Sequence, residues 1–269
     1  MTGDLAAAAE RICEQRPVSI QRFAGGDISG ASRLTFADGS SVVGKSGPVV
    51  GVEARMLEAM AVSSAPVPKV LGYDEQHLLI EHLPSDGTLS GKAWASLAEA
   101  LNALHKVTGE SYGWHEDYAL RHVRVENEAL DDWPRFWAER RLLCHALHIA
   151  TDLAQRIEGL AQALPQLLPR SPAPALLHGD LWGGNVLVSG ERISGLIDPC
   201  AYYGDREVDA ASLTVFDSPP ESFFDALELE AGWRERQPIY RLWMWLLHVR
   251  LFGDSYRPAV ERELATLGL

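Results

Sequence analysis

Short apolar runs separated by turn residues fill the first third of the chain. An alanine-rich start predicts a first helix, and Asp38-Gly39 is a hairpin signal between two later runs. Apolar residues at helical spacing predict a helix over Val49–Val62, which Pro66 and Pro68 close. The predicted β-strands are Val18–Phe23, Gly30–Phe36, Ser41–Lys45, Lys69–Tyr73 and His77–Leu83. This order predicts a small sheet with one helix set among its strands.

From about Leu89 onward the pattern becomes mostly helical. The predicted helices include Trp94–Val107, Trp133–Ala150, Thr151–Leu164 and Arg236–Phe252. One stretch differs, because 176–198 alternates β-branched runs with Gly and Asn turns and predicts a loop and hairpin inside the helical part. We therefore predict an α+β chain of two domains, 1–83 around the sheet and 84–269 mostly helical, joined by the acidic connector 84–87.

Composition and charge narrow the function classes. The chain has 269 residues, 46% hydrophobic and 23% charged, which is typical of a globular protein. A net charge of -13 without a visible basic patch argues against a nucleic-acid partner. The start lacks the basic flank of a signal peptide, and apolar windows such as 242–247 are too short for a membrane span. The cysteines are odd in number and lack metal-ligand spacing, so we expect a cytoplasmic protein.

A glycine-rich turn in the middle of the chain carries an Asp and an Asn five positions apart. The string is His178-Gly179-Asp180-Leu181-Trp182-Gly183-Gly184-Asn185, and Ile197-Asp198-Pro199 follows after a hairpin. Asp and Asn beside Gly often do no more than form turns. In this order, with a lysine upstream, the spacing is that of a kinase catalytic loop and its metal-binding aspartate. Asp180 is then the candidate catalytic base, and Asn185 and Asp198 are candidate Mg²⁺ ligands on ATP.

Three upstream features fit nucleotide binding. Lys45 ends an apolar strand and Glu53 lies in the following helix, which matches the ion pair that holds the phosphates in kinases. The alternative is that both residues are solvated charges on the surface. A glycine-containing loop between the first two strands offers backbone N–H groups for phosphates, although hairpin glycines are common. A segment at the domain junction lies where a kinase hinge meets adenine, although it also reads as a strand end. The loop candidates are Gly25, Gly26, Asp27, Ile28 and Ser29, and the junction candidates are Glu81, His82 and Leu83.

Together these motifs resemble the signature of the fructosamine kinase (ketosamine-3-kinase) family. The likeness rests on the 178–185 string, on Asp198-Pro199 and on Tyr203-Gly204-Asp205-Arg206-Glu207-Val208-Asp209, and it extends to 25–29, 66–73, 133–142 and 236–253. Trp182 and the stretch 204–208 are its specific part, because aminoglycoside and choline kinases share the Asp and Asn spacing. The resemblance implies a protein-kinase-like two-lobe fold and phosphorylation by ATP and Mg²⁺ of the 3-hydroxyl of a ketosamine. The implied acceptors are fructosamine, ribulosamine or erythrulosamine adducts of amines or protein lysines.

The resemblance also suggests roles for individual residues. Asp180 would orient the attacking hydroxyl, and Lys45 would neutralise phosphate charge. Trp182 would either stack on the acceptor or pack beside the loop. The remaining candidates are His178 as a hydrogen-bonded loop residue, Asp209 as a buried support of the loop backbone, and Asp205 with Arg206 at the same junction or in the acceptor pocket.

Two other functions stay open from the sequence. An aminoglycoside-type or other small-alcohol phosphotransferase has the same fold, and the acidic charge would attract polycations, but Trp182 and 204–208 match ketosamine kinases better. The second alternative is a kinase-like binding module without catalysis. The presence of all four polar residues that phosphoryl transfer needs argues against it. The stretch 118–128 differs from the family, so the acceptor is the least defined feature. The oligomeric state is not indicated.

Overall fold

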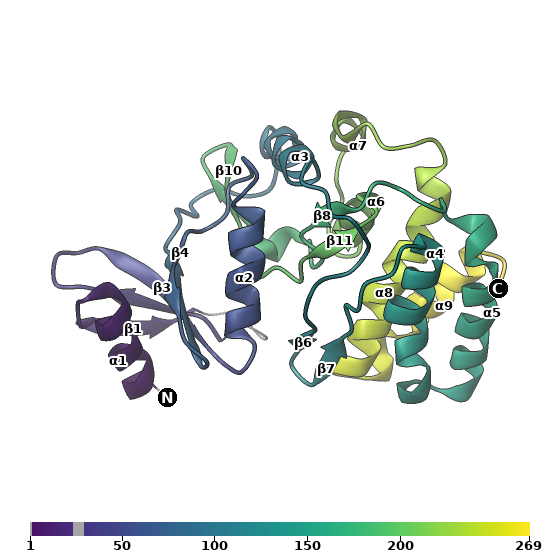
Figure 1. The fold of residues 1–269 in the computed structure, drawn as a ribbon. Coiled ribbons are helices and arrows are strands. Elements are labelled where there is room, and N and C mark those ends of the chain that lie inside the picture. Colours follow the sequence, from purple (N-terminus) through teal and green to yellow (C-terminus); the bar gives the residue numbers. More distant parts are fainter. Residues whose placement is uncertain (1, 24–29) are drawn as a thin grey trace.

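The structure is a computed structural model that describes residues 2–23 and 30–269. Its first part is an antiparallel five-stranded sheet in the order β1-β2-β3-β5-β4. Helix α1 (Thr2–Cys13) covers one face and α2 (Val50–Met60) the other (Figure 1). The strands are β1 (Ser19–Arg22), β2 (Ser32–Thr35), β3 (Ser41–Ser46), β4 (Val70–Tyr73) and β5 (His77–Glu81). All five strands and the helix between them were predicted, with ends that differ by a few residues.

Alternating side chains give the sheet a separate apolar cluster on each face. Leu79 packs with Leu5 of α1, whereas its neighbour Leu78 packs with Leu57 of α2, because successive side chains of a strand point to opposite faces. β3 pairs with both β2 and β5, and Lys45 lies opposite Leu78. The sheet therefore holds Lys45 in a central strand.

The second part of the chain is mostly helical, as predicted. Helix α8 lies at its centre, with Tyr240, Trp243 and Leu246 fully or almost fully buried. The N-terminus lies at the sheet end of the molecule and the C-terminus at the far end of the helical part (Figure 1). The longer helices are α3 (Ala93–Leu104), α5 (Thr151–Leu167), α6 (Glu207–Leu213), α7 (Glu221–Leu227), α8 (Trp233–Phe252) and α9 (Arg257–Thr266).

A loop and hairpin interrupt the helices where the sequence predicted them. β8 (Ala175–Leu177) pairs with β11 (Tyr202–Gly204), and the chain between them forms the turn η3 (Gly183–Asn185) and the hairpin β9–β10. The hairpin strands are β9 (Val186–Ser189) and β10 (Arg192–Leu196). This arrangement confirms the predicted α+β character and brings residues 178 to 198 into one compact loop region.

The predicted helix Trp133–Ala150 is helical over most of its length but is not one regular α-helix. The segment forms a short helix α4 (Trp133–Phe136), a π-helix η1 (Trp137–Leu142) and a 3-10 helix η2 (Leu143–His148). The fully buried Arg141 donates to the Glu126 carbonyl at 2.6 Å and to Asn127 Oδ1 at 2.7 Å, and its guanidinium lies 4.1 Å from the Tyr202 ring centroid. A wider π turn accommodates such a side chain, which hydrophobic spacing does not reveal.

A small hairpin in the structure was not predicted from the sequence. β6 (Tyr118–Leu120) and β7 (Val123–Val125) pair across a turn at Arg121, whose φ is +52°. Strands of three residues give almost no periodicity, and the turn lacks the Asn-Gly or Asp-Gly signal. It lies within 118–128, the stretch that differs from the family pattern.

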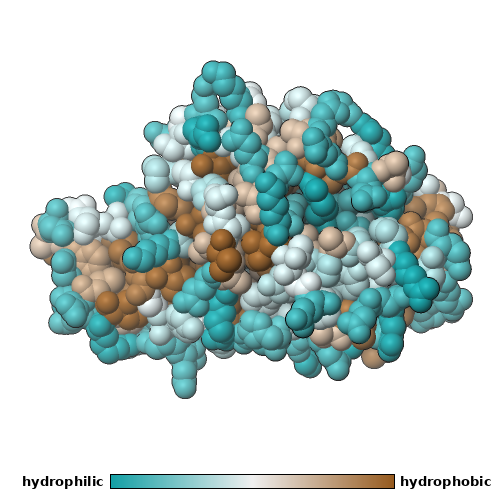
Figure 2. Space-filling view, turned by 45° about the horizontal axis from the view of Figure 1, so that its top comes forward, coloured by the Kyte–Doolittle hydropathy of each residue, from teal (hydrophilic) through white to brown (hydrophobic). Residues whose placement is uncertain are grey.

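Helix α2 belongs to two hydrophobic clusters at once. Val50, Ala54 and Leu57 pack on the sheet, whereas Met56 and Met60 belong to the large core of the helical part. Figure 1 accordingly shows α2 between the sheet and the helical part. Hydrophobic residues gather in the left half of the face drawn in Figure 2, the half that holds the sheet in Figure 1. In the described ranges no helix is long and apolar enough to cross a membrane.

Candidate active site

Lys45, Glu53 and Asp198 meet in one ionic cluster between the sheet and the inserted loop. Lys45 Nζ donates to Glu53 Oε1 and, at 2.5 Å, to Asp198 Oδ1. The side chains of Lys45 and Glu53 are buried, whereas that of Asp198 is 27% exposed. Burial alone would lower the pKa of Lys45, but the two carboxylates outweigh it and raise that pKa, so the amine stays charged. The structure thus joins the predicted strand lysine, helix glutamate and loop aspartate.

Asp180 and Asn185 lie together in the turn that follows β8. Asn185 Nδ2 donates to the Asp180 main-chain carbonyl at 2.8 Å and lies 3.4 Å from Asp180 Oδ2. The Ile197 N–H donates to the Asn185 carbonyl at 3.0 Å, which ties this turn to the residue before Asp198. Burial and the neighbouring Asp198 carboxylate raise the pKa of Asp180 to about 7. The spacing seen in the sequence therefore does correspond to proximity in space.

Asp209 is a buried residue that binds the backbone of the loop before Asp180. It is fully buried, and its carboxylate accepts from the backbone N–H groups of His178 and Gly179 and from His105 Nε2, each at 2.9 Å. Burial would raise the pKa of Asp209, but these donors outweigh it and hold the pKa below its usual range. His105 was not singled out in the sequence, because a lone histidine at the end of a helix carries no signal.

His178 is a second internal support. The Asp180 N–H lies 3.3 Å from its Nδ1, and its Nε2 donates to the Ile197 carbonyl at 2.9 Å. Burial lowers the pKa of His178, so the ring is neutral and has one donor and one acceptor, as these contacts require. These contacts fit the hydrogen-bonded loop residue that the sequence suggested.

The backbone at this site leaves little freedom for substitution. Gly179 has φ +78°, and a Cβ there would lie 2.0 Å from the Cys200 carbonyl oxygen. Asp198 has φ +55°, a left-handed conformation that costs a non-glycine residue of the order of 1 kcal/mol. The loop therefore holds its acidic side chains in a fixed and partly strained geometry.

The oxygen donors present suit a hard cation such as Mg²⁺. Asn185 Nδ2 faces Asp180, which leaves Asn185 Oδ1 available, and Asp198 has a second carboxylate oxygen beside the one on Lys45. Magnesium prefers oxygen ligands and keeps several waters or phosphate oxygens, so two protein ligands are enough. In the described part of the chain no group of three or more His, Cys, Asp or Glu side chains forms a metal site. The pair therefore fits a metal that arrives with a nucleotide.

Asp205 and Arg206 make contacts inside the helical part. Asp205 is buried and accepts from the Tyr240 hydroxyl at 2.7 Å. Arg206 Nη2 donates to Asn102 Oδ1 at 2.7 Å and to the Leu227 carbonyl. Of the two roles considered for this pair, their contacts favour the packing junction.

The junction candidates line the end of β5. Glu81 is exposed, His82 Nδ1 lies 3.1 Å from Ser41 Oγ, and the Leu83 side chain lies close against Gly195. The junction thus contacts the inserted hairpin through Leu83. The predicted phosphate-loop residues, 25–29, lie outside the described residues.

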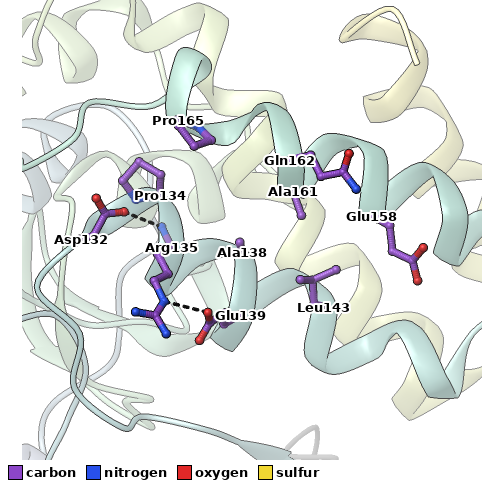
Figure 3. A pocket seen from close by; sticks show the side chains of 10 residues that line it. All are labelled: Asp132, Pro134, Arg135, Ala138, Glu139, Leu143, Glu158, Ala161, Gln162 and Pro165. Atoms are coloured by element: carbon purple, nitrogen blue, oxygen red, sulfur yellow. Dashed lines mark hydrogen bonds and ion pairs between the residues drawn. The ribbon is translucent and has the colours of Figure 1, made fainter.

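A hollow elsewhere on the molecule contains none of the predicted site residues. It has a volume of about 410 Å³ and lies between α4, η1 and α5 (Figure 3). Figure 3 shows Arg135 bridging to Glu139 at its rim, with Glu158 and Gln162 on the neighbouring helix. The candidate active site lies elsewhere, in the region between the sheet and the inserted loop.

Comparison with solved structures shows the fold class of the protein. An aminoglycoside phosphotransferase crystallised as a ternary complex with ADP and hygromycin B superposes with a TM-score of 0.67, at 14% identity, over 98% of this chain and 96% of that one. This likeness shows the fold, so the protein has the predicted protein-kinase-like architecture. The ionic cluster and the Asp180 loop are parts of this fold.

Closer relatives place the chain within one family of this class. The family model "Fructosamine kinase" matches residues 8–268, and the chain belongs to that family. A probable ketoamine kinase of Synechocystis is 35% identical over 228 residues, which cover 79% of this chain and 76% of that protein. The crystal structure of a Thermobifida fusca protein, provisionally named a fructosamine-3-kinase, superposes with a TM-score of 0.90 at 28% identity. The superposition covers 98% of this chain and 99% of the Thermobifida fusca chain. The protein is an ATP-dependent phosphotransferase.

Proposed function

We propose that the protein transfers the γ-phosphoryl group of ATP to the 3-hydroxyl of a ketosamine, a ketose attached through an amine. The observation that carries this proposal is the convergence of Lys45, Glu53 and Asp198 beside the Asp180 and Asn185 turn, in a chain of the fructosamine kinase family. Trp182, two residues beyond Asp180, is 39% exposed and supports an acceptor site next to the base.

The residues divide the work of phosphoryl transfer between them. Lys45, held by Glu53, would neutralise charge on the α- and β-phosphates. Asn185 and Asp198 would hold Mg²⁺, which supplies electrostatic stabilisation of the transferring phosphoryl group when bound. Asp180 would orient the acceptor hydroxyl and accept its proton. His178 and Asp209 would act as positioning residues, because they contact the loop backbone and not the reacting atoms.

Nucleotide binding would involve both parts of the chain. We assign residues 1–83 to a nucleotide-binding lobe and 84–269 to a lobe with the catalytic loop and acceptor site. Residues 25–29 would cover the phosphates, and Glu81, His82 and Leu83 would form the adenine hinge. Asp205 and Arg206 we assign to packing.

One screen separates this function from its alternatives. ATP consumption is measured with fructosyl-lysine, ribulosyl-lysine, erythrulosyl-lysine, free fructose and several aminoglycosides, and the phosphate position is read by NMR. A 3-phosphate on a ketosamine, with free fructose much poorer, is the expected result, because the amine part adds binding contacts that position the hydroxyl. Turnover confined to aminoglycosides would overturn the proposal, and absence of Mg-ATP binding would indicate a non-catalytic module.

A further inference from the structure

A strip of aromatic rings leads away from the candidate catalytic loop. Trp182 stands edge-on to Phe216, with 6.0 Å between ring centroids, and Phe216 lies 5.0 Å from His248. Phe252 continues the line at 5.4 Å from His248, and Tyr256 lies against both of these rings. We call these five residues the aromatic strip.

Three rings of the aromatic strip are exposed, whereas His248 is half-buried and Tyr256 packs partly against the large core. The exposed fractions are 39% for Trp182, 46% for Phe216 and 39% for Phe252. His248 and Phe252 are four positions apart on α8 and therefore share one helix face. On the same helix Trp243 is buried, whereas His248 is half-buried. Neighbouring apolar rings left in water commonly mark a binding site.

One end of the strip is tied to the candidate transfer site. The Gly183 N–H donates to Asp217 Oδ2 at 2.7 Å, so the loop that carries Phe216 is fixed to the catalytic loop. Trp182 belongs to the same loop as Asp180. An acceptor whose hydroxyl reaches Asp180 would therefore extend its remaining part over Trp182 and Phe216.

The chemistry of the strip favours a positively charged ligand. Aromatic faces attract cations, and the Arg121 guanidinium already lies 5.3 Å from the Phe252 ring centroid at the far end. His248 Nδ1 donates to the Met244 carbonyl at 2.7 Å, which leaves Nε2 as a hydrogen-bond acceptor. Burial lowers the pKa of His248 and keeps that ring neutral. Asp217 adds a carboxylate at the near end.

We propose that Phe216 and His248 form a subsite for the amine part of the acceptor, and that this subsite selects ketosamines whose amine carries a second positive charge. The proposal rests on the proposed function and specifies its acceptor. Arg121 already covers Phe252, so the ligand cation is placed at Phe216, whose side chain is 46% exposed and whose ring centroid lies 5.0 Å from that of His248.

The test uses three acceptors made from the same ketose with butylamine, putrescine and γ-aminobutyrate. The three amine parts have the same chain length and differ only in a neutral, cationic or anionic end. We expect kcat/KM to fall in the order cationic, neutral, anionic, with the cationic acceptor ahead of the neutral one by about 3- to 30-fold, mainly through KM. Equal values for the three acceptors would overturn the inference while leaving the proposed function standing.

Variants locate the preference in the strip. Phe216→Leu keeps apolar volume but removes the ring, and the side chain is exposed enough for the fold to tolerate the change. The ratio of kcat/KM for the cationic and neutral acceptors should fall toward one. Phe224→Leu is the matched control, because Phe224 stacks on Trp233 at 4.8 Å, outside the strip, and the ratio should persist. An unchanged ratio in Phe216→Leu would refute the subsite, and turnover of no ketosamine would overturn the proposed function and the inference together.

Discussion

Arg55 and Glu116 form a bidentate ion pair between α2 and the segment that precedes β6. Arg55 Nε lies 2.5 Å from Glu116 Oε1, and Arg55 Nη2 lies 2.6 Å from Glu116 Oε2. Arg55 follows Glu53 by two positions on α2, so this pair helps to hold the helix whose glutamate contacts Lys45. No sequence pattern points to this pair, because its two residues are far apart in the chain.

Reversing one charge of this pair should weaken ATP use. Arg55→Glu places two like charges together and should raise the KM for ATP by about fivefold, equivalent to roughly 1 kcal/mol for a partly exposed pair. The double variant Arg55→Glu with Glu116→Arg restores the pair and should recover most of the loss. Steady-state kinetics at low and high salt measure both effects. A double variant no better than the sum of the single ones would show that the ion pair has no positioning role.

Asp180→Asn should abolish most turnover but keep nucleotide binding. The carboxylate that orients and deprotonates the acceptor hydroxyl is lost, and a positioned base contributes about 10²- to 10⁴-fold. The triphosphate is held by other residues, so the dissociation constant for Mg-ATP, measured by calorimetry, should change little. Turnover at the wild-type rate would mean that the base lies elsewhere.

Asp198→Ala should affect the nucleotide itself. It removes a candidate metal ligand and one of the two carboxylates on Lys45. We expect affinity for Mg-ATP to fall by about tenfold or more and the magnesium concentration for half-maximal rate to rise. Asp225→Ala serves as the control carboxylate, since Asp225 is exposed on α7 and belongs to neither the ionic cluster nor the aromatic strip. An unchanged magnesium requirement in Asp198→Ala would contradict the assigned role.

Acid should destabilise the protein through His145. This side chain is buried, and burial together with the charges of Arg250 and Arg141 lowers its pKa to about 3. As the pH falls below the usual histidine pKa of about 6.5, the unfolded chain gains a proton that the folded one cannot bind. The free energy of unfolding should therefore fall by up to about 1.4 kcal/mol per pH unit between those two values.

Denaturant titrations across this pH window test the contribution of His145. His145→Phe should flatten the dependence, whereas substitution of the exposed His148 by Gln should leave it nearly unchanged. Equal slopes for the wild type and His145→Phe would rule out His145 as the source.

The sequence indicated which candidate residues would lie together because kinase chemistry needs fixed local spacings. Asp180, Asn185 and Asp198 lie within one loop and hairpin, so their order in the chain almost determines their proximity. Lys45 and Glu53 could be paired only by way of the family pattern, and the structure brings them together. Contacts between distant segments, such as the hydrogen bond between His105 and Asp209, have no sequence spacing from which they could be predicted.

The failures of prediction share a physical cause. The π turn at η1 depends on where the buried Arg141 finds acceptors, and the β6–β7 hairpin depends on tertiary packing of two three-residue strands. Hydrophobic periodicity reports that a face is apolar, but it does not report what lies against it.

The shared position of α2 bears on how the molecule unfolds. Because Met56 and Met60 belong to the large core while Val50 and Leu57 belong to the sheet cluster, loss of either core removes packing from the same helix. The two parts should therefore melt in a single cooperative transition in calorimetry. A fragment ending at residue 83 would leave one side of α2 bare and should remain only partly folded, so the boundary between the proposed lobes separates functions rather than independent folding units.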